Sequence, residues 1–425
     1  MIYSYFAVHI TLTKKSITKF MYKKILKEKL KEIDKIITLQ YKNENHIGVL
    51  SGLSGIALFQ FYYSKYLDVD KHSDMGAEIL TTCIDRINDG YSYPTYCTGM
   101  AGMGWVLDHL KQEGFIDIDN DSLLQETDKY LYSTMVLDMK NEKYDFLHGG
   151  IGYAFYFLNR YRNTKSKELK DKYKKIILEF IASLNDLSLK DGENNLKWLS
   201  ELNNDAKERA YNLSLAHGMS SIVGILTKLY QYDDFEANTR TMLIKSINYI
   251  MTFKNENEEA FCLFPSSISE KKEVNNLSRL AWCYGDLGIG IKLWQASKVL
   301  NDKKLANEAI NILKHAAKRT TPEKSLVRDA GICHGSFGNA QIFFRLYKDT
   351  REEVFKEATD FWIQEGIKMA IHKDGYAGYK QWKGIHNIGW SNEIILLEGV
   401  AGIGLTIIDY LASFDSNWDE CLLIS

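Results

Sequence analysis

Side chains that can bind a metal or transfer a proton recur one or two residues before a glycine. Cys333 and His334 stand two and one residues before a glycine in the stretch 329–338, and Cys283 stands two before another. His217 directly precedes a third. Each of these glycines begins a Gly-x-x-Gly or Gly-x-x-Ser step. The shared position indicates that the three stretches have related roles.

Two thiolates and one imidazole, without a fourth protein ligand in an obvious motif, are typical of a catalytic zinc site with one open position. We therefore expect Cys283, Cys333 and His334 to bind Zn²⁺. Buried structural cysteines and a capping histidine are the alternative, but three such residues at one repeat position favour a metal. His217 could complete the zinc sphere or act as an acid/base group. Because a fourth ligand would close the site, we favour the acid/base role.

Other polar residues near the same glycines are candidates for the pocket. Asp145 and Arg279 lie four and six residues before their glycines and could add opposite charges. Tyr284 and Trp282 flank the cysteine of the second stretch and either shape the pocket or simply pack. His148 is as consistent with a histidine bonded to neighbouring backbone as with a role in the pocket.

The glycine step is the mark of an internal repeat. Its first glycines are Gly52, Gly99, Gly149, Gly218, Gly285, Gly335 and Gly399, with Ser221 replacing the second glycine of the fourth copy. The intervals are uneven, from 47 residues (52 to 99) to 69 (149 to 218), so the extra length must lie in loops or insertions. An apolar run follows each step, and amphipathic segments such as 169–184 precede it. The unit is therefore an amphipathic outer helix, a loop, a glycine step and a buried helix.

Seven such units can form an open superhelix or a closed ring. Glycine at the start of each buried helix favours the ring, because it lets backbones approach closely. We predict an all-α fold, an α/α toroid of seven inner and seven outer helices, which brings the loops before the glycines to one end. Residues 21–425 are expected to form this single domain, and 1–20 to be a loosely ordered extension before Met21.

Composition narrows the class of protein. The chain has 425 residues and a net charge of −2, so it lacks the basic excess that nucleic-acid binding would require. No apolar run approaches ~18 residues, so no membrane-spanning helix is expected, and the first dozen residues lack the features of a signal peptide. Six cysteines give no disulfide framework and suit a reducing, cytoplasmic environment.

The sequence resembles the LanC family, the lanthionine synthetase C-like cyclases that close thioether rings in lantibiotic precursor peptides. The resemblance extends over all seven repeats. It is most specific at Trp282-Cys283-Tyr284-Gly285, Cys333-His334-Gly335 and Ala216-His217-Gly218. The sequence departs from the family at Leu287, where proline is usual, and at Ser214 and Ser221, where glycine is usual. These departures concern the loop and the helix start rather than the ligands.

The resemblance implies an α/α toroid that binds one zinc ion. The implied zinc ligands are Cys283, Cys333 and His334. The implied functional side chains are His217 as acid/base group, Asp145 and Arg279, and we place Tyr284 beside them in the catalytic set.

The implied reaction joins a cysteine of a precursor peptide to a serine or threonine that another enzyme has already dehydrated. The thiolate, generated at the zinc, adds to dehydroalanine or dehydrobutyrine. His217 is the expected proton donor to the α-carbon, with Asp145 orienting or tuning it and Arg279 helping to hold negative charge. The resemblance also implies a complex with a dehydratase and an exporter, which would hold this cytoplasmic protein peripherally at the membrane.

Three other functions remain open at this point. The same zinc chemistry could add glutathione or another thiol to dehydrated residues. A zinc-stabilised scaffold could bind a peptide without chemistry, although the presence of His217, Asp145 and Arg279 counts against it. A glycosidase-like toroid would need paired carboxylates at its mouth and has no use for two cysteines and a histidine.

Overall fold

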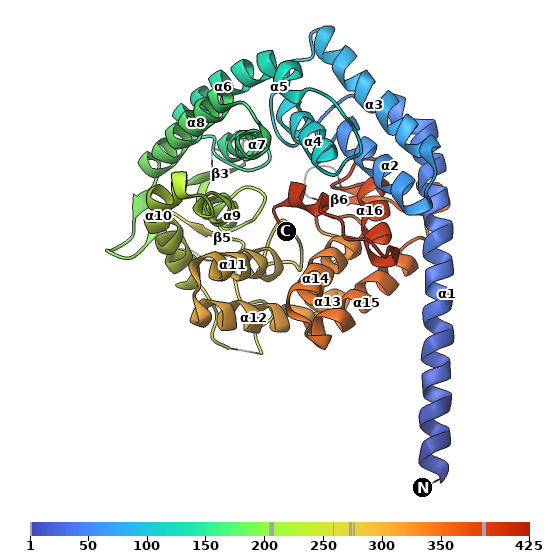
Figure 1. Ribbon diagram of the computed structural model, residues 1–425. Helices are drawn as coiled ribbons and strands as arrows, with labels where there is room; N and C mark the ends of the chain where they lie inside the picture. Colours follow the sequence, from blue (N-terminus) through green and yellow to red (C-terminus); the bar gives the residue numbers. More distant parts are fainter. Residues whose placement is uncertain (1, 204–207, 258, 272–273, 275–276, 385–387) are drawn as a thin grey trace.

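Inner and outer helices alternate along the chain (Figure 1). The computed structural model describes residues 2–203, 208–257, 259–271, 274, 277–384 and 388–425, and the side chains of all of these except 2–20, 202–203 and 208. The inner helices are α2 (Leu53–Leu67), α4 (Met100–Gln112), α7 (Gly150–Asn163), α9 (Met219–Tyr230), α11 (Asp286–Leu300), α14 (Ser336–Thr350) and α16 (Val400–Leu411). The outer helices are α1 (Ile2–Gln40), α3 (Asp70–Asn88), α6 (Gln125–Lys140), α8 (Lys167–Asp186), α10 (Asp233–Met251), α12 (Lys303–Ala317) and α15 (Glu353–Lys368).

Hydrophobic patterning separates the two layers. Inner helices are buried along most of their length, as in α16, where Val400 to Asp409 are all buried. Outer helices bury one face only. In α8 the buried residues are Tyr173, Ile176, Ile177, Phe180, Ile181 and Leu184, at the spacing of a single helix face. The amphipathic pattern of 169–184 therefore predicted this helix correctly.

The ring is closed. Each inner helix contacts the next one along the chain, and the last, α16, contacts the first, α2 (Figure 1). Outer helices α3, α8, α10, α12 and α15 each pack on the inner helix that precedes them, and α1 packs on α16. The predicted α/α toroid is confirmed. Its closure places the first and the last inner helix side by side.

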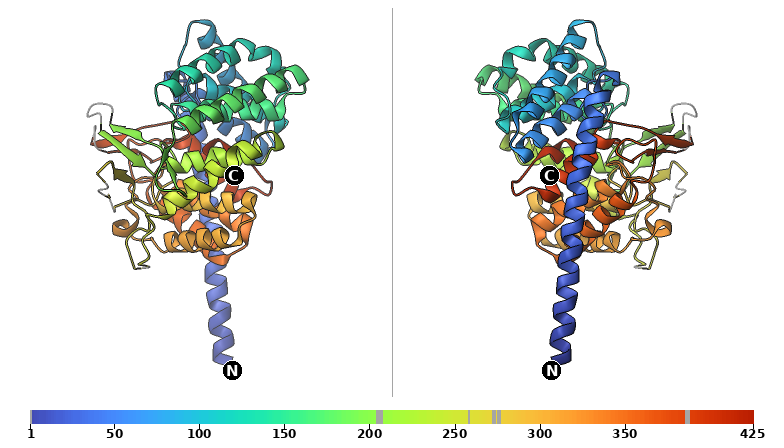
Figure 2. Two further views of the ribbon diagram at one scale, coloured as in Figure 1. Left: turned by 90° about the vertical axis from the view of Figure 1, so that its left-hand side faces the viewer. Right: turned by 90° about the vertical axis from the view of Figure 1, so that its right-hand side faces the viewer.

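Short strands, which the all-α prediction did not include, lie in the three longest intervals between glycine steps. The strands are β1 (Leu189–Lys190), β2 (Leu196–Lys197), β3 (Ser200–Asn203), β4 (Glu208–Asn212), β5 (Ser267–Ser269), β6 (Gln381–Lys383) and β7 (Gly389–Ser391). They pair antiparallel in the orders β1-β2, β3-β4-β5 and β6-β7. Figure 2 shows them projecting from one side of the ring. The uneven repeat length is thus accounted for by insertions.

Short helical turns complete the described elements. They are η1 (Tyr41–Asn43), α5 (Asn120–Leu123), α13 (Pro322–Ser325) and η2 (Trp418–Leu422).

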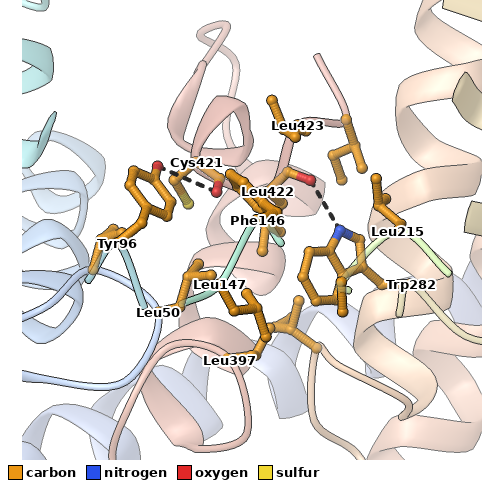
Figure 3. Close-up of a cluster of buried hydrophobic side chains, with 14 of the residues drawn as sticks. Leu50, Tyr96, Phe146, Leu147, Leu215, Trp282, Leu397, Cys421, Leu422 and Leu423 are labelled. Carbon is orange, nitrogen blue, oxygen red and sulfur yellow. Dashed lines mark hydrogen bonds between the residues drawn. The ribbon is translucent and has the colours of Figure 1, made fainter. Parts of the chain in front are cut away.

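The centre of the ring is filled by the last residues of the chain (Figures 1 and 3). Cys421, Leu422 and Leu423 are fully buried. The Tyr96 hydroxyl donates a hydrogen bond to the Cys421 carbonyl (3.3 Å), and the Trp282 indole N–H donates to the Leu422 carbonyl (2.9 Å). This segment therefore forms part of the core rather than a surface tail.

Helix α1 extends well beyond the ring toward its N-terminal end (Figure 2). The side chains of residues 2–20 lie outside the described part, so the loose attachment of residues 1–20 and the domain boundary at residue 21 stay predictions. Within the described part of the chain, every helix is too short or too polar to cross a membrane.

Candidate active site

The loop before each inner helix packs tightly against the start of that helix. A Cβ atom on Gly338, in the first turn of α14, would lie 1.9 Å from the carbonyl oxygen of Ile332. The same atom on Gly402 would lie 2.0 Å from the carbonyl oxygen of Leu396. Such contacts leave no room for a side chain at these two positions, which explains why glycine ends both of these repeat steps.

A circle of backbone hydrogen bonds connects these loops. In six of the seven repeats, the residue two before the glycine donates its N–H to the carbonyl of the corresponding residue in the next repeat. The bonds join Leu50 to Cys97, Cys97 to Leu147, Ala216 to Cys283, Cys283 to Cys333, Cys333 to Leu397, and Leu397 back to Leu50. Among the described residues, the step from Leu147 to Ala216 is the one without such a bond. Both candidate cysteine ligands are thus fixed by main-chain bonds to each other and to their neighbours.

The residue directly before each glycine lines one cavity of about 680 Å³. These residues are Ser51, Thr98, His148, His217, Tyr284, His334 and Glu398, and all are polar. Cys283, Cys333 and Arg279 line the same cavity. Sequence reasoning did not single out Ser51, Thr98 or Glu398, although their position before the repeat glycine was the available signal. Burial raises the pKa of the Glu398 carboxyl.

The predicted zinc ligands come together in this cavity. One potential ligand atom from each of Cys283, Cys333 and His334 lies within 4.8 Å of the others. Tetrahedral zinc with bonds of 2.0–2.3 Å places its ligand atoms roughly 3.5–4 Å apart, so the group has the right size and chemistry for the ion. The hydrogen bond between the two thiols holds the pKa of Cys283 well below its ordinary value and raises the pKa of Cys333 well above it, so that one thiol of the pair is favoured as thiolate. A depressed thiol pKa favours the thiolate that a metal requires.

Asp329 orients the histidine of this group. Its Oδ2 atom lies 3.1 Å from Nε2 of His334, which leaves Nδ1 as the nitrogen available to a metal. Burial lowers the pKa of His334, but the hydrogen bonds to Asp329 and Cys283 outweigh it and raise the pKa to about 10. Asp329 is itself fixed, because the backbone N–H of Gly331 donates to its Oδ1 (3.0 Å). This is the carboxylate–histidine arrangement common beside protein-bound metals.

A second pair of polar groups includes His217, which lines the same cavity. Nδ1 of His217 is 3.6 Å from Oδ1 of Asp145, and the backbone N–H of His148 donates to the same oxygen (2.7 Å). Burial lowers the pKa of His217, but the carboxylate of Asp145 outweighs it and the pKa is raised. The imidazole ring of His148 stacks on that of His217 at 6.1 Å between centroids, and burial lowers its pKa. The pair thus favours a protonated His217 beside an ionised Asp145.

Two of the departures from the family pattern have a local role. The Ser214 hydroxyl accepts a hydrogen bond from the backbone N–H of His217 (3.0 Å), which fixes the loop that carries the imidazole. Ser221 donates from its hydroxyl to the Gly218 carbonyl (2.7 Å) at the start of α9. Serine therefore supports the turn at both positions.

Tyr284 and Arg279 also reach the cavity. The Asn212 side-chain amide lies 3.5 Å from the Tyr284 hydroxyl, and burial raises the pKa of that phenol. Arg279 is exposed on the cavity wall and, among the residues described, forms no ion pair. The structure thus brings six of the predicted site residues to one cavity: Cys283, Cys333, His334, His217, Tyr284 and Arg279. Asp145 lies beside His217 but is not among the residues that line the cavity. Their individual roles stay predictions.

Comparisons with known proteins identify relatives of this chain. "Glutathione S-transferase LANCL1" of Danio rerio is 26% identical over 220 residues, covering 49% of this chain and 47% of that protein. "Nisin biosynthesis protein NisC" of Lactococcus lactis subsp. lactis is 23% identical over 287 residues, covering 61% of this chain and 64% of that protein. The matched regions thus span about half and just under two thirds of these relatives.

The fold has a counterpart among solved structures. A structure of nisin cyclase superimposes with a TM-score of 0.70 at 20% identity, covering 93% of this chain and 97% of that one. The family model described as "Lanthionine synthetase C-like protein" matches residues 17–423. That match extends from within α1 to the buried C-terminal segment, and the chain belongs to the lanthionine synthetase C-like family.

Proposed function

We propose that this protein is a zinc-dependent lanthionine cyclase. It would add cysteine thiols to dehydroalanine or dehydrobutyrine in a dehydrated precursor peptide and so form thioether rings. The observation that carries the proposal is that two chemically distinct groups share one cavity. Cys283, Cys333 and His334 place potential metal-ligand atoms close together, and His217, which faces Asp145, lines the same cavity.

The donor set fits zinc in ligand type, spacing and support of the histidine. When bound by these side chains, zinc supplies an open coordination position and lowers the pKa of a thiol placed there. The chain contributes the fixed geometry, because Cys283 and Cys333 are linked by a main-chain hydrogen bond of 3.3 Å.

The addition itself needs a proton and a place for negative charge. The substrate sulfur forms a bond to the β-carbon, the carbon–carbon π bond breaks, and the electron pair moves onto the neighbouring carbonyl as an enolate. His217, kept protonated by Asp145, then delivers a proton to the α-carbon. Arg279 stabilises the developing negative charge, and the Tyr284 hydroxyl provides a neutral donor at the cavity wall. The substrate thiol releases one proton when it becomes a thiolate, and the α-carbon gains one, so the product has the mass of the reactant.

Addition of glutathione or another thiol to dehydrated residues is the second candidate. The name of the LANCL1 relative supports it, and the same side chains would serve. The two reactions differ in mass. Ring formation removes an alkylatable thiol without changing the peptide mass, whereas glutathione addition increases the mass by one glutathione.

The first test combines zinc analysis with a cyclisation assay. We expect about one zinc per chain in the parent protein and almost none in Cys333→Ala, which should also fail to cyclise. His217→Ala should retain zinc and lose cyclisation. Cyclisation is read by alkylation and mass spectrometry of a dehydrated peptide that contains one cysteine. If the folded parent protein contained no zinc although zinc had been supplied during its production, the mechanism would be contradicted. A peptide-binding scaffold would then be the better interpretation.

The proposal extends to partners and location. A cyclase of this kind receives a peptide that a dehydratase has prepared, and we propose that it works in the cytoplasm, in a complex with that dehydratase and an exporter at the membrane. Co-purification of the tagged protein with a dehydratase from the native cell would test this part independently of the chemistry.

A further inference from the structure

A second cavity opens directly beside the candidate active site. Its volume is about 690 Å³, and it shares Leu277, Arg279 and His334 with the first cavity. The two cavities therefore meet at the candidate zinc ligand. The remaining wall of the second cavity includes Leu326, Arg328, Trp382 and Ile388. We call this second cavity the side groove.

The side groove presents apolar side chains to solvent. Leu277 is 58% exposed and Ile388 is 81% exposed. The guanidinium group of Arg328 lies 5.1 Å from the centre of the Trp382 ring, a cation–π contact at the edge of the groove. Contiguous exposed apolar surface of this kind, rimmed by polar groups, is a mark of a ligand or protein contact.

The wall formed by Trp382 is connected to the candidate zinc site by a hydrogen bond. Trp382 in β6 pairs with Trp390 in β7, and their rings make an edge contact at 5.2 Å. The backbone N–H of Trp382 donates to Oδ2 of Asp329 (3.0 Å), the same oxygen that faces His334. Asp329 therefore fixes the position of the hairpin relative to His334. A binding wall next to a reactive centre needs such a fixed position.

The reaction itself defines what can occupy this groove. An extended chain advances about 3.3–3.6 Å per residue, so a cysteine that reaches the candidate zinc site brings its neighbours within about 7 Å of it. Those neighbours must enter a space that borders His334, and the side groove is such a space. We propose that the side groove binds an apolar side chain adjacent to the reacting cysteine of the peptide and thereby selects which cysteine is used. This inference rests on the proposed function.

The test compares two dehydrated peptides that differ only in the neighbours of the cysteine, leucine in one and glycine in the other. Burial of a leucine side chain corresponds to roughly 10- to 100-fold in affinity. We expect kcat/KM for cyclisation by the parent to be about tenfold or more higher for the leucine peptide. Trp382→Ala and, separately, Leu277→Ala should reduce that preference. Trp294→Ala, which changes a partly buried tryptophan on α11 that lines neither cavity, should retain it.

A second measurement separates this inference from the proposed function. Fluorescence anisotropy gives the Kd of matched peptides in which serine replaces the dehydrated residue, so no reaction can occur. Equal kcat/KM and equal Kd for the leucine and glycine peptides would overturn the proposed role of the side groove, while the cyclase assignment would stand. A leucine preference in Kd that is lost in Trp382→Ala, without cyclisation of either reactive peptide, would retain the groove and reject the cyclase. Normal zinc content and circular dichroism of each variant confirm that it folds.

Discussion

The imidazole of His334 in the candidate zinc site faces the carboxylate of Asp329, with Nε2 and Oδ2 3.1 Å apart. A carboxylate beside a histidine ligand influences both the orientation and the basicity of the ring. Asp329→Asn keeps an oxygen that can accept from Gly331 but removes the negative charge facing the ring. We expect zinc affinity to fall by about 10- to 100-fold, measured by competition with a chelator.

The control for this prediction is Asp360→Asn, which removes a carboxylate that accepts a hydrogen bond from Tyr410. It should leave zinc affinity unchanged. Equal zinc affinity in Asp329→Asn and the parent would mean that Asp329 only supports the hairpin that carries Trp382.

The proton donor gives a prediction for pH dependence. A raised pKa keeps His217 protonated to higher pH, so the cyclisation rate should fall only as the pH rises through that raised value. Asp145→Asn removes the opposite charge and leaves burial, which lowers the pKa, as the main influence. The alkaline limb of the rate profile should therefore move to lower pH, by about one to three units.

The measurement is the initial rate of thiol loss across a pH series with zinc content held constant. Glu353→Gln, which changes a surface ion pair with Lys356, is the matched control and should reproduce the parent profile. An alkaline limb that does not move in Asp145→Asn would exclude His217 as the titrating donor.

At the scale of the element, the glycine step packs the start of each inner helix against the loop that carries the site residues. A methyl group on Gly338 would collide with the Ile332 carbonyl, and the same turn carries Cys333 and His334. Gly338→Ala should therefore destabilise the fold by about 1–3 kcal/mol and also lose zinc. Gly389→Ala is the control, because nothing lies within 4 Å of its added Cβ. Urea unfolding and zinc analysis of the two variants test the prediction, and two equally stable variants would contradict it.

The helical elements were accessible from the sequence because their signals are local. Periodic apolar residues predicted α8, and the glycine steps placed the start of every inner helix. Closure of the ring followed from the small size of those glycines. The convergence of Cys283, Cys333 and His334 could then be predicted from their place in the repeat alone.

The short strands and the side groove were not accessible in the same way. Trp382 and Trp390 belong to three-residue strands whose pairing depends on tertiary contacts, and neither shows a periodic pattern. Glu398 was missed for a different reason. Its place before Gly399 matches that of His334 before Gly335, but the sequence analysis did not extend the comparison of this position to the seventh repeat.

At the scale of the whole molecule, the C-terminal segment connects the core of the ring to the site. Trp282 donates to the Leu422 carbonyl inside the ring, and the residue after Trp282 is the candidate ligand Cys283 (Figure 3). A four-residue apolar run, 421–424, carries no periodic signal, so its place at the centre could not be predicted from sequence. The inner helices surround this buried segment (Figure 1). We therefore expect the core to unfold and the metal site to be lost in a single cooperative transition.

Leu422→Ala tests that coupling. The side chain is fully buried at the ring centre, and truncating a buried leucine costs about 2–5 kcal/mol through lost burial and the cavity left behind. Leu137→Ala, at a position 58% exposed on α6, should change stability by less than about 0.5 kcal/mol. In the Leu422→Ala variant, tryptophan fluorescence and zinc release should report a single transition at lower urea concentration. If zinc were released well before the fluorescence changed, the metal site would unfold independently, and the central segment would stabilise the ring without positioning the ligands.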